Sequence, residues 1–338
     1  MKCCATLLAA VLLCALPANA AVEPGHTIGA IDFFGYEGLD VGRTRAALPM
    51  HAGDSLTDHT EKSIEAAVVG AIGVKPTDIA VVCCDAAGRQ LIYIGLPGKT
   101  YRLSAFNQPP TASEHLPEKV ADLYDRADES WIAAVKKGGG AADENDSMGF
   151  ALAKDPATRR LQLQKHAWAV AHEAELIRVL RGSSDKDERQ IASDLLGYSR
   201  QSPAQINTLV QAASDPDSGV RNNATRALGV LVTAKPALAR TIPPEKFIAM
   251  LYSGTWFDRN KAVGLLVAMT ARRDQALLAK IKAQGLDPLV EIAEWSEAGH
   301  AGLARIVLGR IGGIPEQKLG VLVLNGPVEE IVNAALKR

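Results

Sequence analysis

Two adjacent cysteines, Cys83 and Cys84, are the residues of this sequence best suited to redox or metal chemistry. They lie in the apolar run IAVVCCDAAGRQLIYIGLPG, residues 79–98. Neighbouring side chains of an extended strand point to opposite faces, so one metal ion would need ligands from both sides of a sheet. Free cysteine usually packs as a small apolar residue. We interpret both as strand residues of a hairpin and keep a thiol or metal function as the alternative.

A second candidate is the stretch GLPGKT, residues 95–100, which ends like a phosphate-binding P-loop. The full motif needs a glycine five residues before Gly98, where this sequence has Tyr93. It also needs a helix directly afterwards, so that backbone N–H groups face the phosphate. The sequence that follows, YRLSAFNQPP, is a poor helix former. We expect a turn at the end of a strand rather than a nucleotide site.

Histidines and acidic residues form two further groups. His166, His172 and Glu173 fall on one predicted helix, where six residues turn the chain by about 240° and the two histidines diverge. Loop and helix-cap chemistry accounts for the other group, which comprises His51, Asp54, Asp58 and His59. The sequence also lacks GxSxG, HExxH and paired CxxC motifs. We assign no catalytic residue, no metal and no cofactor.

The 338-residue chain has a formal net charge of −1 and no basic cluster typical of nucleic-acid binding, so we expect no nucleic-acid partner. It begins MKCCATLLAAVLLCALPANA, one lysine followed by an apolar run and small residues. This pattern predicts a secretory signal peptide, residues 1–20, cleaved after Ala20, and hence a periplasmic or secreted protein. A membrane-spanning helix needs about 20 apolar residues, and neither this run nor a later stretch is long enough.

Residues 26–103 are predicted to form a small α+β domain with the order strand, helix, helix, strand, strand. The first strand carries TIGAIDFFG, and the hairpin around the two cysteines closes the domain. With FFGYEGLD after the first strand and LPMHAGDSL between the helices, the region resembles a POTRA domain. The resemblance implies a non-enzymatic protein-binding module of the bacterial cell envelope, which often adds a partner strand to a sheet edge. A role in membrane insertion is not carried over, because no barrel, division or transport segment follows.

Residues 104–153 connect this domain to the rest of the chain. SAFNQPPTASEHLPEK has the proline and polar content of a linker. Apolar residues at helical spacing then predict a helix over about 114–137. Both hairpin strands are apolar on both faces, and such a sheet needs two covers, so we expect this helix to lie against the sheet. The following GGGAADENDS predicts a flexible acidic loop.

One phrase recurs in residues 154–338, an alanine followed four residues later by a leucine. It begins at Arg189 (RQIASDLLG), Arg221 (RNNATRALG), Arg259 (RNKAVGLLV) and Ala301 (AGLARIVLG). Alanine and leucine at this spacing share one helix face, where alanine permits close approach of a neighbouring helix. A period within about 20–50 residues is typical of a solenoid built from helix pairs.

The first two units carry an aspartate four residues before the arginine: Asp185 before Arg189 and Asp217 before Arg221. In this respect the region resembles HEAT repeats of the short bacterial type. The resemblance implies that such arginines pair with the preceding aspartate and tie neighbouring units into a structural ladder. We favour this ladder, continued by Arg259, over an anion-binding stripe.

The predicted fold class is mainly α, with a C-terminal HEAT-like α-solenoid, residues 154–338, preceded by the small βααββ POTRA-like domain. We expect the second helices of the repeats to bind protein through Gln205, Thr208, Gln211, Lys246 and Tyr252. Trp256 lies between helices, where exposed aromatic residues tend to become binding anchors.

These features predict an exported, non-enzymatic protein-binding or scaffolding protein. The alternative is an enzyme or enzyme-assembly factor of the HEAT-like lyase type. A protein partner is expected, while its identity and the oligomeric state stay open.

Overall fold

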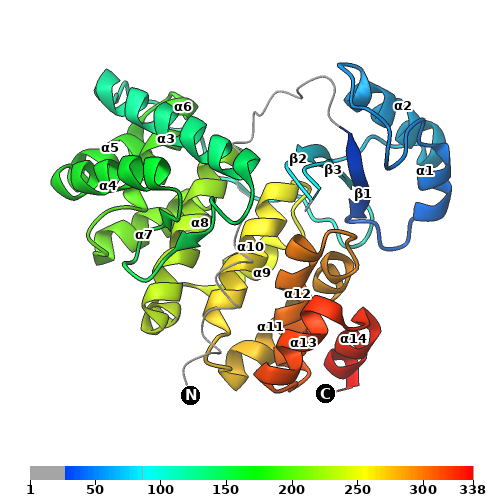
Figure 1. The fold of residues 1–338 in the computed structure, drawn as a ribbon. Coiled ribbons are helices and arrows are strands. Elements are labelled where there is room, and N and C mark those ends of the chain that lie inside the picture. Colours follow the sequence, from blue (N-terminus) through cyan, green and yellow to red (C-terminus); the bar gives the residue numbers. More distant parts are fainter. Residues whose placement is uncertain (1–26, 86, 338) are drawn as a thin grey trace. The chain divides into compact units, whose positions relative to one another are not determined.

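The computed structural model describes residues 27–85 and 87–337, so the expected signal peptide and its cleavage site after Ala20 lie outside the described residues. The described chain divides into two compact units (Figure 1). Unit 1 comprises Ala105–Pro243 and Gly264–Arg272, and unit 2 comprises residues 27–104, Pro244–Val263 and 273–337. None of the helices in these ranges combines the length and the apolar character that a bilayer crossing requires.

Unit 2 begins with five elements in the order that the sequence predicts for the first domain. They are β1 (Ile28–Phe34), α1 (Val41–Ala47), α2 (Thr60–Ile72), β2 (Asp78–Val82) and β3 (Gln90–Gly95). The sheet has the order β1-β3-β2, with β1 parallel and β2 antiparallel to β3. The hairpin forms as predicted, but β2 ends at Val82, whereas the sequence predicts a strand through Cys84.

Local sequence signals fix where the helices of this module begin and end. Asp40 caps α1 by accepting a hydrogen bond of 2.9 Å from a backbone N–H of the first turn. Gly73 ends α2 in the left-handed conformation, with φ of 75°, which glycine adopts without steric cost. Ile64 and Val68, one turn apart on α2, share a buried cluster with Ile92 of β3. The two helices thus cover one face of the sheet.

The remaining elements of unit 2 are helices. They are α9 (Pro244–Met250), the first part of α10 (Trp256–Met269), α11 (Gln275–Ala293), α12 (Ala298–Ile311), α13 (Glu316–Asn325) and α14 (Val328–Lys337). Helix α11 packs against β1, and Tyr93 of β3 stacks on Trp256 of α10 with ring centroids 5.0 Å apart. The second cover of the sheet, expected from the helix over 114–137, is supplied by α10 and α11 instead.

Unit 1 is helical except for one short hairpin. Its elements are α3 (Glu118–Lys137), β4 (Glu144–Asn145), β5 (Leu152–Ala153), α4 (Pro156–Ala171), α5 (Glu173–Gly182), α6 (Lys186–Leu196), α7 (Pro203–Ala212), α8 (Ser218–Ala234), the 3₁₀ helix η2 (Pro236–Thr241) and the end of α10. Helix α3 packs against α4 and α6. The predicted helix is present, but its expected contact with the sheet was wrong, because an amphipathic pattern does not specify the covering surface. The prediction of a flexible acidic loop over residues 138–147 was wrong in part, because Glu144–Asn145 form β4 and pair with β5.

The linker of unit 1 follows the turns between helices. The Asn107 N–H donates to the Ser214 carbonyl at 2.7 Å, and the Ala112 N–H donates to the Gly182 carbonyl at 2.9 Å. Further along, the Leu116 N–H donates to the Glu188 carboxylate at 3.0 Å. Residues 105–117 are therefore an ordered part of this unit.

Candidate functional site

The two edge strands of the sheet in unit 2 differ in how their outer backbone groups are paired. Carbonyl groups of β1 accept hydrogen bonds from other parts of the unit: Gly53 N–H to Ile28 O at 2.8 Å, Arg45 Nη1 to Ile31 O at 2.8 Å and Trp295 Nε1 to Phe33 O at 3.0 Å. An edge strand without such partners is a template for pairing with another chain. The β1 edge is closed in this sense, which leaves β2 as the candidate pairing edge.

The hydrogen-bond pattern of β3 shows which residues of β2 face this edge. Gln90 donates toward the β1 side and Gly95 accepts from the β2 side, both at 2.8 Å. Because the backbone groups of successive strand residues point to alternate sides, those of residues 91, 93 and 95 point toward β2. Their partners in β2 are residues 82, 80 and 78. The backbone N–H and C=O groups of Ile79 and Val81 consequently point away from β3, while their side chains pack on the buried cluster; we call these two residues the free edge.

Only part of the free edge is available for pairing. The Ile79 N–H interacts with the neighbouring Asp78 carboxylate and favours its charged form. Within the described residues, the backbone groups of Val81 have no hydrogen-bond partner. Val81 is therefore the central position at which a partner strand could bond.

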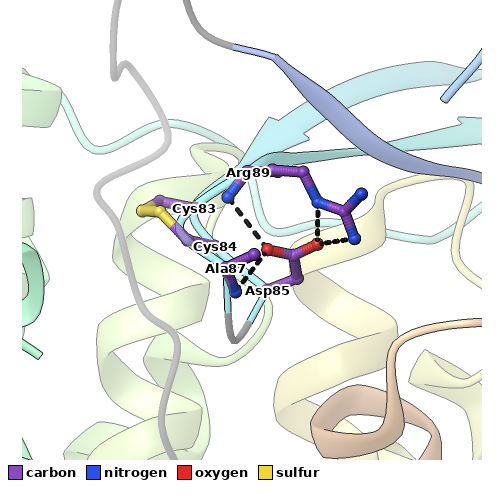
Figure 2. The surroundings of a disulfide bond; sticks show 5 residues. All are labelled: Cys83, Cys84, Asp85, Ala87 and Arg89. Atoms are coloured by element: carbon purple, nitrogen blue, oxygen red, sulfur yellow. Dashed lines mark hydrogen bonds and ion pairs between the residues drawn. A yellow bond between two sulfur atoms is a disulfide. The ribbon is translucent and has the colours of Figure 1, made fainter. Parts of the chain in front are cut away.

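Cys83 and Cys84 directly follow β2 and are joined by a disulfide bond (Figure 2). Both are partly exposed. The interpretation as two unbonded thiols in a strand does not hold, because β2 ends before them and the alternation of strand side chains no longer separates them.

The disulfide occupies a bulge of the hairpin. The last strand pair is Val82 with Leu91, and the next backbone bond runs from the Asp85 N–H to the Arg89 carbonyl at 2.9 Å. Between these bonds, two cysteines oppose the single residue Gln90, which is the arrangement of a β-bulge. Bulges at sheet edges terminate pairing, and this one lies at the end of the free edge.

Asp85 fixes the turn beyond the bulge (Figure 2). Its Oδ1 accepts from the backbone N–H groups of Ala87 and Arg89, each at 2.9 Å, and its Oδ2 accepts from Arg89 Nε at 2.7 Å. Burial by itself would raise the pKa of the Asp85 carboxyl, but these bonds together outweigh burial and hold the pKa below its usual range. The turn is therefore held independently of the disulfide.

Glu291 of α11 connects the helices of unit 2 to the loop after β1. Its Oε2 accepts from the Gly35 N–H at 2.8 Å, and its Oε1 accepts from the Tyr36 N–H at 3.1 Å and from the Thr100 hydroxyl at 2.5 Å. Burial raises the pKa of Glu291, although these bonds and the Arg259 guanidinium favour its charged form. The carboxylate thus serves as the hydrogen-bond acceptor for several backbone N–H groups of the βααββ module that would otherwise bond to water.

Two carboxylates of the module bind backbone N–H groups where helices α10 and α12 begin. Asp78 Oδ2 accepts from the Trp256 N–H at 2.8 Å, and Asp32 Oδ2 accepts from the Ser296 N–H at 2.8 Å. A carboxylate at a helix N-terminus satisfies unpaired N–H groups and complements the helix dipole. Burial raises the pKa of Asp78 to about 6. The module and these helices are joined by hydrogen bonds in both directions.

Aromatic side chains fill the contact between the sheet and these helices. The Tyr93 hydroxyl lies 2.7 Å from His300 Nδ1, and Trp256 and Trp295 both pack on the Tyr93 ring. Burial lowers the pKa of His300 to about 3, so this side chain is neutral at physiological pH. Trp256 is fully buried here, which corrects its expected role as an exposed anchor.

The repeated arginines are buried and bind both turns and acids. Arg189 pairs in bidentate fashion with Asp215, at 2.8 and 2.9 Å, and donates to the Ser183 carbonyl at 3.0 Å. The acid that Arg189 pairs with thus belongs to the following repeat. Asp185 does not take part, because it caps α6 by accepting from the Asp187 N–H. An aspartate at the N-cap is held by its own helix, so it is not available to the arginine.

Arg221 and Arg259 likewise donate to the carbonyl groups of the turns before their helices, and Arg259 also pairs with an acid. Arg221 donates to the Asp215 carbonyl at 2.9 Å, while Asp217 caps α8. Arg259 donates to the Ser253 carbonyl at 2.7 Å and the Thr100 carbonyl at 2.6 Å, and it pairs with Glu291 at 3.4 Å. Their side chains are buried, so these arginines do not form an exposed anion-binding stripe.

Residues 173–243 match the family model of HEAT repeats. No curated protein matches the chain. Residues 173–243 are thus similar to HEAT repeats, an architecture associated with protein-interaction scaffolds. The match lies within unit 1 and includes the Arg189 and Arg221 positions.

Most residues expected on the binding face of the HEAT helices are buried. Gln205 donates to the Leu196 carbonyl at 2.5 Å, and Thr208 accepts from Arg181. Tyr252 is also buried, beneath the Arg102 guanidinium, which lies 3.7 Å from its ring centroid. Gln211 is exposed and Lys246 half-buried. The expected face is reduced to these two residues, in different units.

Sequence reasoning missed a partly buried polar network in unit 1. Arg226 of α8 pairs with Glu144 of β4, and Gln162 of α4 donates to the same carboxylate at 2.7 Å. Phe150, also in the segment after α3, stacks on His166 with centroids 4.0 Å apart. The signal was a set of polar residues at apolar positions of the helices. Among the described residues, no three histidines, cysteines or acids are arranged to hold a metal ion.

Proposed function

We propose that this chain is an exported protein-binding scaffold that receives an extended segment of its partner along the free edge of β2. The carrying observation is the contrast between the edges: β1 carbonyls are bonded within unit 2, whereas Val81 has no backbone partner among the described residues. Strand addition supplies affinity through main-chain hydrogen bonds. The POTRA-like order of the module agrees with this mode of binding.

Two observations support export. The first 20 residues have the charge, apolar run and small residues of a signal peptide. The Cys83–Cys84 disulfide is typical of proteins in oxidising compartments. Fractionation of cells that produce the protein natively should find it outside the cytoplasm, with an N-terminus that begins after Ala20.

The HEAT repeats support the scaffold role. Repeat arrays present extended surfaces built from successive units. Gln211 on α7 is the expected contact residue that stays exposed in unit 1. The proposal assigns no catalytic residue, cofactor or metal to the chain.

Photo-crosslinking at Val81 tests the binding edge. A photoreactive residue at Val81 of the full chain should capture one partner, identified by mass spectrometry, in cells that make the protein. The same residue at Val69 of α2, whose side chain is 38 % exposed, is the control within the same module. Capture of the same proteins from both positions would show that the edge is not selective.

A proline substitution then tests main-chain pairing with the identified partner. Val81→Pro removes an outward N–H and leaves the β2–β3 hydrogen bonds in place, because the backbone groups of Val81 point away from β3. Loss of one such bond, about 0.5–1.5 kcal/mol, predicts binding weaker by up to about tenfold. Val69→Ala should bind like the wild type. Equal affinity of Val81→Pro and wild type, with both folded by circular dichroism, would reject strand addition.

A further inference from the structure

The Cys83–Cys84 disulfide lies at the end of the surface proposed for binding. We propose that it is a reducible lock on the free edge of β2, a control that rests on the proposed function of that edge. In the oxidised protein, the edge ends after Val82. After reduction by a dithiol, Cys83 becomes able to extend the strand as a third outward position after Ile79 and Val81, while Cys84 stays the extra residue of the bulge.

A disulfide between neighbours and an extended strand exclude each other. A disulfide brings two Cβ atoms to about 3.8 Å. Successive side chains of a strand instead point to opposite faces. The bonded pair therefore has to leave the strand, and the observed ladder does stop at Val82 paired with Leu91. Gln90 of β3 keeps its partner in β1 and faces the two-residue bulge on its other side.

Length matters at this edge because it is short. Pairing with a second strand uses alternate residues, and of the two outward residues in β2, Ile79 lies directly beside the Asp78 carboxylate, with which its N–H interacts. Adding Cys83 would extend the outward series at the end that is remote from this carboxylate. A bulge whose two residues are tied by a disulfide blocks this position, and bulges are one way in which sheet edges avoid pairing.

The surrounding turn should survive reduction. Asp85 holds the backbone N–H groups of Ala87 and Arg89 and the Arg89 side chain, so only two residues lie between fixed points. The sulfur atoms lie on the side of the chain away from the Asp85–Arg89 pair (Figure 2). Both cysteines are partly exposed, which allows a thiol reductant to reach them.

The redox step is an ordinary thiol–disulfide exchange with a dithiol. One thiolate of the reductant attacks one Sγ, the Sγ–Sγ bond breaks, and the electron pair moves to the other sulfur, which takes up a proton. The second thiol of the reductant, as its thiolate, then displaces the protein from the mixed disulfide. Both cysteines end as thiols, and the reductant ends as its disulfide.

Alkylation tests whether the bond exists and is accessible. Full-length protein, exported and purified without reductant, is treated with iodoacetamide before and after dithiothreitol, without denaturant. The peptide that contains Cys83 and Cys84 should carry no label before reduction and two labels afterwards. Free thiols in the freshly purified protein, or a bond that only denaturant makes reducible, would overturn the lock.

Carbon-13 labelling of cysteine then reports the conformation, with a Cys83→Ser/Cys84→Ser variant and its serines labelled as a permanently open reference. Reduction should move the Cβ shifts to those of thiols and the backbone shifts to values typical of a strand. Crosslinking from Val81 should rise after reduction, and it should be high and insensitive to dithiothreitol in the double variant. Thiol Cβ shifts without strand backbone shifts would reject the lock. If Val81→Pro still loses the partner in that case, strand addition stands and only its redox control fails.

Discussion

Removal of the Glu291 carboxylate should strongly destabilise unit 2. Glu291 is 5 % exposed, accepts hydrogen bonds from Gly35, Tyr36 and Thr100, and pairs with the fully buried Arg259. Glu291→Ala leaves that guanidinium without its acid. Breaking a buried pair in this way costs about 3–5 kcal/mol, because an uncompensated charge stays buried. We expect a loss of this size in the free energy of unfolding.

Urea unfolding followed by tryptophan fluorescence measures this loss, since Trp256 and Trp295 of unit 2 both pack on Tyr93 of the sheet. Glu294→Ala is the matched control: the same residue type, three positions along, exposed and bonded to the Tyr36 hydroxyl at 3.1 Å. It should change stability little. A Glu291→Ala loss below about 1 kcal/mol, the size of one ordinary hydrogen bond, would refute the assigned role of the carboxylate.

Two further predictions concern buried charges. The pKa of Asp78 is raised from 3.8 to about 6 in the folded state, so between these values the folded protein binds a proton that the unfolded chain releases. The free energy of unfolding should therefore rise as pH falls from about 7 to 4. At about 1.4 kcal/mol for each unit of pKa, Asp78→Asn should lose about 3 kcal/mol of that rise, measured by unfolding across this pH range. Parallel pH profiles of variant and wild type would contradict this. Arg189→Ala should cost about 3–5 kcal/mol, because it leaves the buried Asp215 carboxylate unpaired, whereas Arg178→Ala, which breaks an exposed pair, should leave the melting temperature nearly unchanged.

Local patterns predicted the elements of the chain well. Strand alternation, helical spacing and end signals such as Gly73 act within a few residues, so they can be read from one sequence. The βααββ order and the helix α3 were predicted on this basis, and the HEAT phrase was readable because it recurs along the chain, with its Arg189 and Arg221 copies inside the matched residues.

Packing partners could not be predicted in the same way. The apolar face of α3 indicated burial without saying against what, and Trp256 gave no sign that the sheet would cover it. Arg189 shows the limit most clearly: its preceding Asp185 suggested a local pair, but the bidentate partner is Asp215, 26 residues later. A helix cap and an ion-pair partner look alike in sequence, since both are an aspartate near a helix start.

The disulfide also escaped prediction for a physical reason. The alternation rule placed Cys83 and Cys84 on opposite faces, which would be correct if the strand continued. If the β2–β3 register continued, Cys84 would pair with Arg89. Instead Asp85 bonds to Arg89, so the hairpin is shifted by one residue at the two cysteines. Such a bulge leaves no periodic signal, since it changes the count of residues on one strand only.

The contacts within unit 2 indicate that the βααββ module is not an independently folded domain joined to the helices by a linker alone. Asp32 and Asp78 satisfy N–H groups at helix starts, and Glu291 satisfies N–H groups of the module in return. Separation would expose both sets together with the Tyr93 face of the sheet. A surface held in this way is structural and unavailable for binding. Since the β1 edge is also bonded within unit 2, partner pairing with this sheet falls to β2, where the disulfide ends the strand.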